Sequence, residues 1–109
     1  MKSTQASRIF AALSHEKRLD VFRLLVQRGA GGVAATDIAK SLKIQPATLS
    51  FHLKELAAVG LVDARQDGRF IYYNADFATV DRIMQFLVDN CCGGEACEAK
   101  PAERRKSAI

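Results

Sequence analysis

Two short helical patterns separated by a proline constrain the fold of this chain more than any other feature. The first pattern begins at Thr36 or Asp37, and the second runs from Pro46 to about Val59, where Gly60 ends it. Proline suits the first turn of a helix, because its fixed φ matches that position and no helical hydrogen bond needs its missing N–H. The sequence therefore predicts two short helices joined by a tight turn.

Two short strand patterns come directly after these helices. They span residues 61–65 and 69–74, and residues 66–68 (QDG) between them are a tight-turn sequence of the Asp-Gly type. A pair of short helices followed by a two-stranded hairpin is the winged helix-turn-helix pattern. We therefore expect a mainly α fold with a small β-hairpin wing.

Further helical patterns flank this motif. A short one spans residues 7–13, a second follows Ser14 as its N-cap, and a last one runs from about residue 78 to residue 90. The short helix is unstable alone, so it must dock on the rest of the fold. Apolar residues cover more than one face of the last helix, which predicts that it packs on its own core and on a partner. The core stripe expected in the second helix is Leu19, Phe22, Leu25 and Val26, widened by Val21 and Leu24.

The second helix of the central pair separates its side chains into an apolar face and a small or polar face. At about 100° per residue, Leu49, Leu53 and Leu56 fall together and are expected to face the core. Small residues on the other face let such a helix enter a major groove, where hydroxyls and a lysine reach base edges and phosphates. An ordinary amphipathic helix with a partly buried Phe51 is the alternative. The residues expected to face DNA are Gln45, Ala47, Thr48, Ser50, Phe51 and Lys54.

The expected wing carries two arginines beside its turn. Arg65 and Arg69 flank this turn, and the negative potential of a DNA minor groove favours arginine there. His52 lies between the two faces of the preceding helix, so three roles are open for it: a hydrogen bond within the fold, a phosphate contact and, with least support, a metal ligand. Arg65, Arg69 and His52 complete the set of candidate DNA-binding residues.

Four strings of residues carry a resemblance to a known family. They are residues 12–19 (ALSHEKRL), 45–56 (QPATLSFHLKEL), 60–62 (GLV) and 68–73 (GRFIYY). Together they resemble the ArsR/SmtB family of metal-responsive winged-helix repressors. The resemblance implies a homodimer held by the first and last helices, which binds double-stranded operator DNA with two half-sites. Ile44 departs from the family pattern. Many members place a serine there, just before the helix that reads the DNA (the recognition helix, here residues 46–59).

The three cysteines of the chain, Cys91, Cys92 and Cys97, fall within seven residues. Thiolates select soft ions, and three of them leave tetrahedral zinc one ligand short, whereas trivalent arsenic or antimony bonds three sulfurs in a pyramid. Gly93 and Gly94 permit the turn that brings Cys97 back toward the other two. The last helix must fray at its end for Cys91 and Cys92 to bind one ion.

The family resemblance narrows the interpretation of these cysteines. The common arsenic site, a Cys-x-Cys on the third helix, is absent from residues 34–38 (AATDI), and the last helix lacks the histidines of a zinc site. The trio resembles instead the C-terminal three-cysteine site of an arsenic-responsive subgroup. We therefore expect As(III) or Sb(III) as an inducer that releases the operator, with no organic cofactor. A redox or persulfide switch, cadmium or lead sensing, and a tail with incidental cysteines are the alternatives.

Length and composition agree with a small DNA-binding protein. The 109 residues suffice for one core, 49% of them are hydrophobic, and a net charge of +4 suits a nucleic-acid partner. No apolar run approaches the roughly 18–20 residues of a membrane span, and no secretory signal is evident, so we expect a cytoplasmic protein. An enzyme is not expected, because no nucleophile–base pair is evident. We expect residues 1–90 to form the DNA-binding and dimerisation domain and residues 91–109 to form a sensing segment and flexible basic tail.

Overall fold

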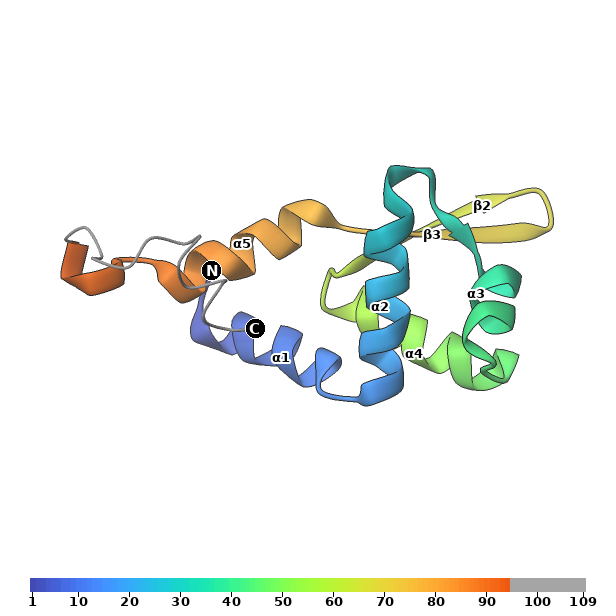
Figure 1. Ribbon diagram of the computed structural model, residues 1–109, viewed down its shortest axis with the longest axis horizontal. Coiled ribbons are helices and arrows are strands. Elements are labelled where there is room, and N and C mark those ends of the chain that lie inside the picture. Colours follow the sequence, from blue (N-terminus) through green and yellow to red (C-terminus); the bar gives the residue numbers. More distant parts are fainter. Residues whose placement is uncertain (95–109) are drawn as a thin grey trace.

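The computed structural model describes residues 1–94, which form a mainly helical fold with one small sheet (Figure 1). Short 3-10 turns occur at Gly29–Gly31 and Cys91–Gly94. Within the described residues, every helix is too short or too polar to span a bilayer. The helices and strands, in chain order, are α1 (Ser3–Leu13), α2 (Glu16–Arg28), β1 (Val33–Ala34), α3 (Ala35–Leu42), α4 (Pro46–Ala58), β2 (Val62–Asp67), β3 (Phe70–Ala75) and α5 (Phe77–Val88).

The first two helices differ from the prediction at their junction and at the start of α1. The backbone N–H of Lys2 donates to Gln5 Oε1 (3.0 Å), so a polar contact starts α1 four residues before the predicted apolar pattern. Ser14 does not cap α2. Its hydroxyl donates to the carbonyl of Ala11 (2.8 Å) at the end of α1, and His15 takes the N-cap position of α2.

The core face of α2 is turned relative to the predicted stripe. Val21, Phe22 and Leu25 are buried, whereas Leu19 and Val26 are exposed. Leu25 lies at the centre of this face, with Val21 and Phe22 on either side of it. Leu19 and Val26 lie about 100° further round the helix, where they face away from the core. The prediction that Leu19 and Val26 are core residues is therefore wrong.

The turn between α3 and α4 has the predicted form. Lys43 adopts a left-handed conformation (φ 54°) that ends α3, and Pro46 occupies the first turn of α4. Ile44 between them is buried and joins the hydrophobic core. The residue that departs from the family pattern is therefore an apolar anchor between the two helices.

The wing is a hairpin of β2 and β3 closed by a two-residue turn. Asp67 pairs with Phe70, so Gly68 and Arg69 form the turn. The predicted turn at residues 66–68 is therefore placed too early, because Asp67 still belongs to β2. Gly68 supplies the positive φ (63°) that such a turn requires.

A third strand joins the hairpin to the body of the molecule. β1 pairs antiparallel with β3, giving the spatial order β1-β3-β2. The side-chain amide of Asn74 in β3 also donates to the carbonyl of Ala30, in the loop after α2. β1 was not predicted, because its two residues, Val33 and Ala34, are too few to show a strand period.

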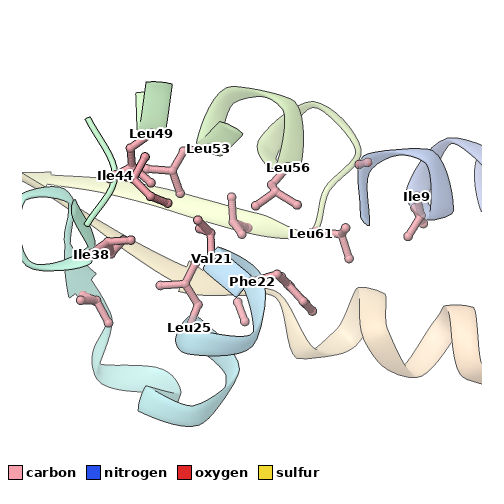
Figure 2. Packing of buried hydrophobic residues seen from close by; sticks show 14 of the residues in the cluster. Ile9, Val21, Phe22, Leu25, Ile38, Ile44, Leu49, Leu53, Leu56 and Leu61 are labelled. Atoms are coloured by element: carbon pink, nitrogen blue, oxygen red, sulfur yellow. The ribbon is translucent and has the colours of Figure 1, made fainter. Parts of the chain in front are cut away.

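The hydrophobic core lies between α2, α3, α4 and the base of the sheet (Figure 2). α1 contributes Ala6, Ile9 and Ala12 to this core, and α5 contributes Ile83. At the start of α5, Asp76 Oδ1 accepts a hydrogen bond from the backbone N–H of Thr79 (3.2 Å). The core residues labelled in Figure 2 are Ile9, Val21, Phe22, Leu25, Ile38, Ile44, Leu49, Leu53, Leu56 and Leu61.

Candidate nucleic-acid interface

The structure separates the two faces of α4 as the sequence predicts. Leu49, Leu53 and Leu56 are buried against the core, whereas Phe51 is 55% exposed. An aromatic ring held out in solvent beside small and hydroxyl-bearing residues suits contact with a thymine methyl group. The other predicted DNA-facing residues on or before this helix are also exposed: Gln45, Ala47, Thr48, Ser50 and Lys54.

His52 lies inside the protein and not on this exposed face. It is 4% exposed, and its Nδ1 accepts a hydrogen bond from Arg18 Nε (3.4 Å). Burial, together with the nearby His15 and Arg18, lowers the pKa of His52 below its usual 6.5, so the ring is neutral near pH 7. Of the three roles open for His52, the structure favours the hydrogen bond within the fold. Its inclusion among the DNA-facing residues is wrong, because the ring is not accessible.

The two wing arginines occupy different positions. Arg65 lies in β2 opposite Tyr72 of β3, and its guanidinium carbon is 5.4 Å from the centre of the tyrosine ring. This cation–π contact holds the arginine against the outer surface of the hairpin. Arg69 lies in the turn itself, and both arginines are exposed. Tyr73, on the other side of β3, packs against the core.

Arg18 contacts the recognition helix, although no sequence-based expectation included it. Its guanidinium carbon is 5.7 Å from the centre of the Phe51 ring, and its Nη1 donates to the carbonyl of Ala12 (3.5 Å). The contact with Phe51 crosses from α2 to α4, so no local period reveals it. The string at residues 12–19, which carries part of the family resemblance, was the only available signal.

The cysteines follow α5 and do not continue it. The helix ends at Val88, two residues before its predicted end, so Cys91 and Cys92 lie in the short 3-10 segment beyond it. Cys92 (φ 58°) and Gly93 (φ 67°) have left-handed backbone conformations, so the chain turns at the first of the two glycines. Cys92 is disulfide-bonded. Cys97 lies outside the described residues.

A metal site is not assembled within the part of the chain that the structure describes. Among residues 1–94, no three His, Cys, Asp or Glu side chains lie together in a way that could hold an ion. A site of three thiolates requires Cys97 as well, because the chain has no cysteine besides Cys91, Cys92 and Cys97.

A second exposed surface is apolar and lies on α1 and α5. Phe77, Met84 and Val88 follow one another at spacings of seven and four residues, so they form one stripe along α5. All three are exposed, Met84 to 58%, as are Leu87 beside the stripe and Phe10 on α1. Figure 1 shows α1 and α5 at the end of the molecule away from the wing. Apolar surface gathered in this way marks an interaction site.

These features define a winged helix-turn-helix DNA-binding protein. The recognition helix is α4, a turn precedes it, and the hairpin of β2 and β3 that follows it carries two arginines. A family model described as a helix-turn-helix domain matches residues 13–65, which run from the end of α1 into β2.

Similar proteins identify the family within this class. The chain is 33% identical over 87 residues to the arsenical resistance operon repressor of Staphylococcus aureus, covering 80% of this chain and 81% of that protein. It is 37% identical over 83 residues to the cadmium resistance transcriptional regulatory protein CadC of Listeria innocua, covering 76% and 68%. The homodimeric winged helix-turn-helix domain Mb0332 of Mycobacterium bovis, a possible ArsR-family regulator, has 29% identity and a TM-score of 0.63, with 88% and 89% coverage. The chain therefore belongs to the ArsR/SmtB family and is a DNA-binding transcriptional regulator, not an enzyme.

Proposed function

We propose that this chain is a homodimeric repressor, which holds its operator until As(III) or Sb(III) binds Cys91, Cys92 and Cys97. The exposed outer face of α4, set opposite three buried leucines, is the observation that carries the DNA-binding half of this proposal. Three cysteines that fall within seven residues of one another, the first of them three residues after the end of α5, support the sensing half. The controlled genes encode resistance or efflux functions.

In the proposed complex, α4 lies in the major groove. Thr48 and Ser50 offer hydroxyls that donate to and accept from base edges, Lys54 pairs with a phosphate, and Phe51 contacts a thymine methyl group. The wing lies along the neighbouring minor groove, where Arg69 in the turn meets the negative potential between the phosphates. Arg65, held against Tyr72, contacts the backbone beside it.

The proposed dimer forms through α1 and α5. Their apolar residues, among them Phe10, Met84 and Val88, are exposed in the described part of the protomer. A second copy of the chain would bury them, and the similar domain from Mycobacterium bovis is itself homodimeric. Pairing these ends would present two recognition helices to two half-sites of an operator.

Sensing depends on ligand exchange at the three sulfurs. Arsenous acid gives up its three hydroxyl groups, three As–S bonds form, and three molecules of water leave, so no fourth ligand is needed. Thiolates prefer such soft centres, and the similar protein from Staphylococcus aureus is an arsenical resistance repressor. The disulfide of Cys92 must first be reduced by a cellular dithiol, which supplies two electrons and two protons and is itself oxidised to a disulfide, because a sulfur in a disulfide bond cannot bind arsenic. Binding beside the end of α5 then favours a dimer geometry with lower DNA affinity.

The disulfide at Cys92 favours one alternative, a thiol redox switch. In this alternative, oxidation rather than metalloid binding would change the backbone after α5 and release the DNA. Oxidation removes two electrons and two protons from a pair of thiols, and a cellular peroxide or disulfide would accept them. The two functions use the same sulfurs but respond to different reagents.

One titration separates these functions. Reduced protein is bound to a labelled duplex that carries the region upstream of its own reading frame, and arsenite, cadmium or a disulfide oxidant is added while fluorescence anisotropy is followed. We expect arsenite to release the duplex under reducing conditions. Release by oxidant alone would replace the metalloid proposal with the redox switch, and release by cadmium alone would change the inducer.

The variant Cys97→Ser tests the sulfurs directly. It should bind the duplex as wild type does, because Cys97 lies far in sequence from α4, but it should not release on arsenite. Ser107→Ala, a matched change in the same C-terminal segment that removes no thiol, should release normally. An unchanged arsenite response after serine replaces all three cysteines would end the sensing proposal and leave the DNA-binding one intact.

A further inference from the structure

Three helices meet at the side chain of Arg18, in the first turn of α2. Its Nη1 donates to the carbonyl of Ala12 near the end of α1 (3.5 Å), and its Nε donates to His52 Nδ1 in α4 (3.4 Å). Its guanidinium carbon lies 5.7 Å from the centre of the exposed Phe51 ring. One half-buried cation therefore contacts the end of α1 and two neighbouring residues of the recognition helix.

The contact with His52 requires a neutral imidazole. Nδ1 accepts a hydrogen bond only when it carries no proton, so the proton of the ring is on Nε2. His15, at the N-cap of α2, faces the same ring with the two centroids 4.7 Å apart. The titratable and charged groups that act on His52 are thus His15 and Arg18, both from the start of α2, while α1 presents the Ala12 carbonyl to Arg18.

We propose that Arg18 is a positioning residue of the DNA interface: by joining Ala12 of α1 to His52 and Phe51 of α4, it sets the position of the recognition helix relative to the dimerisation helix. This inference rests on the proposed function, in which α1 belongs to the dimer interface and α4 enters the major groove.

The hydrogen bonds of Arg18 fix the relative orientation of the helices that it contacts, which apolar packing alone does not do. The core that α1 and α2 share with α4 is built from apolar side chains, and burial of apolar surface is non-directional. A guanidinium has its donors in a fixed plane, so it can hold two acceptors on different helices at one relative orientation. In a dimer built on α1, this orientation sets the separation of the two recognition helices, and it also fixes the Phe51 ring at the surface.

Protonation of His52 breaks its hydrogen bond with Arg18. The protonated ring has donors only, so it cannot accept from Arg18, and the two cations repel. Since burial and the two neighbours place the pKa of folded His52 below 6.5, the unfolded chain takes up the proton first as the pH falls. The stability that neutral His52 provides is therefore complete above pH 6.5 and declines as the pH falls from 6.5 through the lowered pKa, whereas DNA affinity declines as the pH falls through the lowered pKa itself.

The test compares two arginines of the same helix. Arg18→Met and the control Arg23→Met each remove one positive charge from α2, but Arg23 is exposed. Duplex affinity is measured by anisotropy on reduced full-length protein between about pH 8 and about pH 5.5, the range in which histidine titrates. Arg18→Met should bind about tenfold more weakly or worse at the higher pH, because it loses both hydrogen bonds of the guanidinium, while Arg23→Met stays within about twofold of wild type.

The shape of the pH profile tests positioning rather than folding. Wild type and Arg23→Met should lose affinity below pH 6.5, while Arg18→Met should not show this loss. His52→Gln keeps a neutral acceptor for Arg18, so it should bind like wild type at the higher pH and keep its affinity in acid. Sedimentation and circular dichroism check that each variant is dimeric and folded.

Two results would overturn the proposal for different reasons. If wild type binds the upstream duplex no better than a scrambled one, the proposed function fails and Arg18 has no interface to position. If wild type binds selectively but Arg18→Met matches Arg23→Met in affinity and pH profile, only the role of Arg18 is wrong. A variant that no longer folds is replaced by Arg18→Lys, which keeps the charge without the fork and should lose affinity at both ends of the pH range.

Discussion

Gly32, in the loop between α2 and β1, has a φ of +81° and lies against the base of the wing. A Cβ atom on this residue would be 2.6 Å from Asn74 Oδ1 and 3.4 Å from the carbonyl oxygen of Tyr73. Asn74 is the residue whose amide donates to Ala30 and ties β3 to this loop. A side chain at position 32 would therefore strain the backbone and push on the contact that anchors the hairpin.

We expect Gly32→Ala to lower the free energy of unfolding by about 1–3 kcal/mol, the range for a non-glycine residue in a strained backbone conformation. Denaturant unfolding monitored by circular dichroism measures this cost. Gly31→Ala is the matched control, because a Cβ there meets nothing within 4 Å and the backbone is not left-handed. The control should stay within about 0.5 kcal/mol of wild type. Equal values for the two variants would mean that Gly32 is not required at the wing base.

The role of His52 could not be predicted from its position in the sequence of α4 alone. Its helical angle placed it between the two faces of α4, which left three roles open. The partners that decide among them, Arg18 and His15, belong to another helix and approach only in the folded chain. Residue type and local spacing do not predict a contact between two different helices. The outward position of Phe51, by contrast, followed from the spacing of the buried leucines around it.

The sequence predicted the helices and strands whose own residues mark where they begin or turn. Pro46, whose fixed φ suits the start of α4, and Gly68, whose positive φ suits the wing turn, were both found as expected. β1 has two residues and depends on pairing with β3, which no local period shows. The core face of α2 was predicted only in part: Phe22 and Leu25 are buried as expected, but Leu19 and Val26 are exposed, because six apolar positions left several stripes open and tertiary packing selected one.

Neighbouring positions on α4 should give opposite phenotypes when changed to alanine. Leu53 is fully buried, so Leu53→Ala should lower the free energy of unfolding by about 2–5 kcal/mol. Lys54 is exposed, so Lys54→Ala should change it by no more than about 0.5 kcal/mol. Lys54→Ala should nevertheless weaken duplex binding on every sequence and reduce the slope of log affinity against log salt by about one, the mark of a lost phosphate contact. An unchanged salt slope would remove Lys54 from the interface.

In the whole molecule, the two proposed activities lie at opposite ends. α3, α4 and the wing form one end, and α1 and α5 form the other, with α2 between them (Figure 1). The cysteines follow α5, so an ion bound there acts first on the dimer end. In the proposed mechanism, the signal would reach the DNA through the relative position of two protomers, with the apolar stripe on α5 as part of their interface. Sensing and dimerisation are thus expected to share one interface.

If the proposed dimer forms in this way, DNA binding depends on the stripe, although the stripe lies outside α4 and the wing. Met84→Lys places a charge within the stripe, so it should convert the dimer to monomer in sedimentation experiments. Gln85→Lys, the matched control, adds the same charge on an exposed neighbouring position outside the stripe and should leave the dimer intact. With one half-site contact in place of two, the monomer should bind the duplex about 100-fold more weakly or worse. A monomeric Met84→Lys that kept full affinity would show that a single protomer recognises the operator, and the ion could then not act through the dimer.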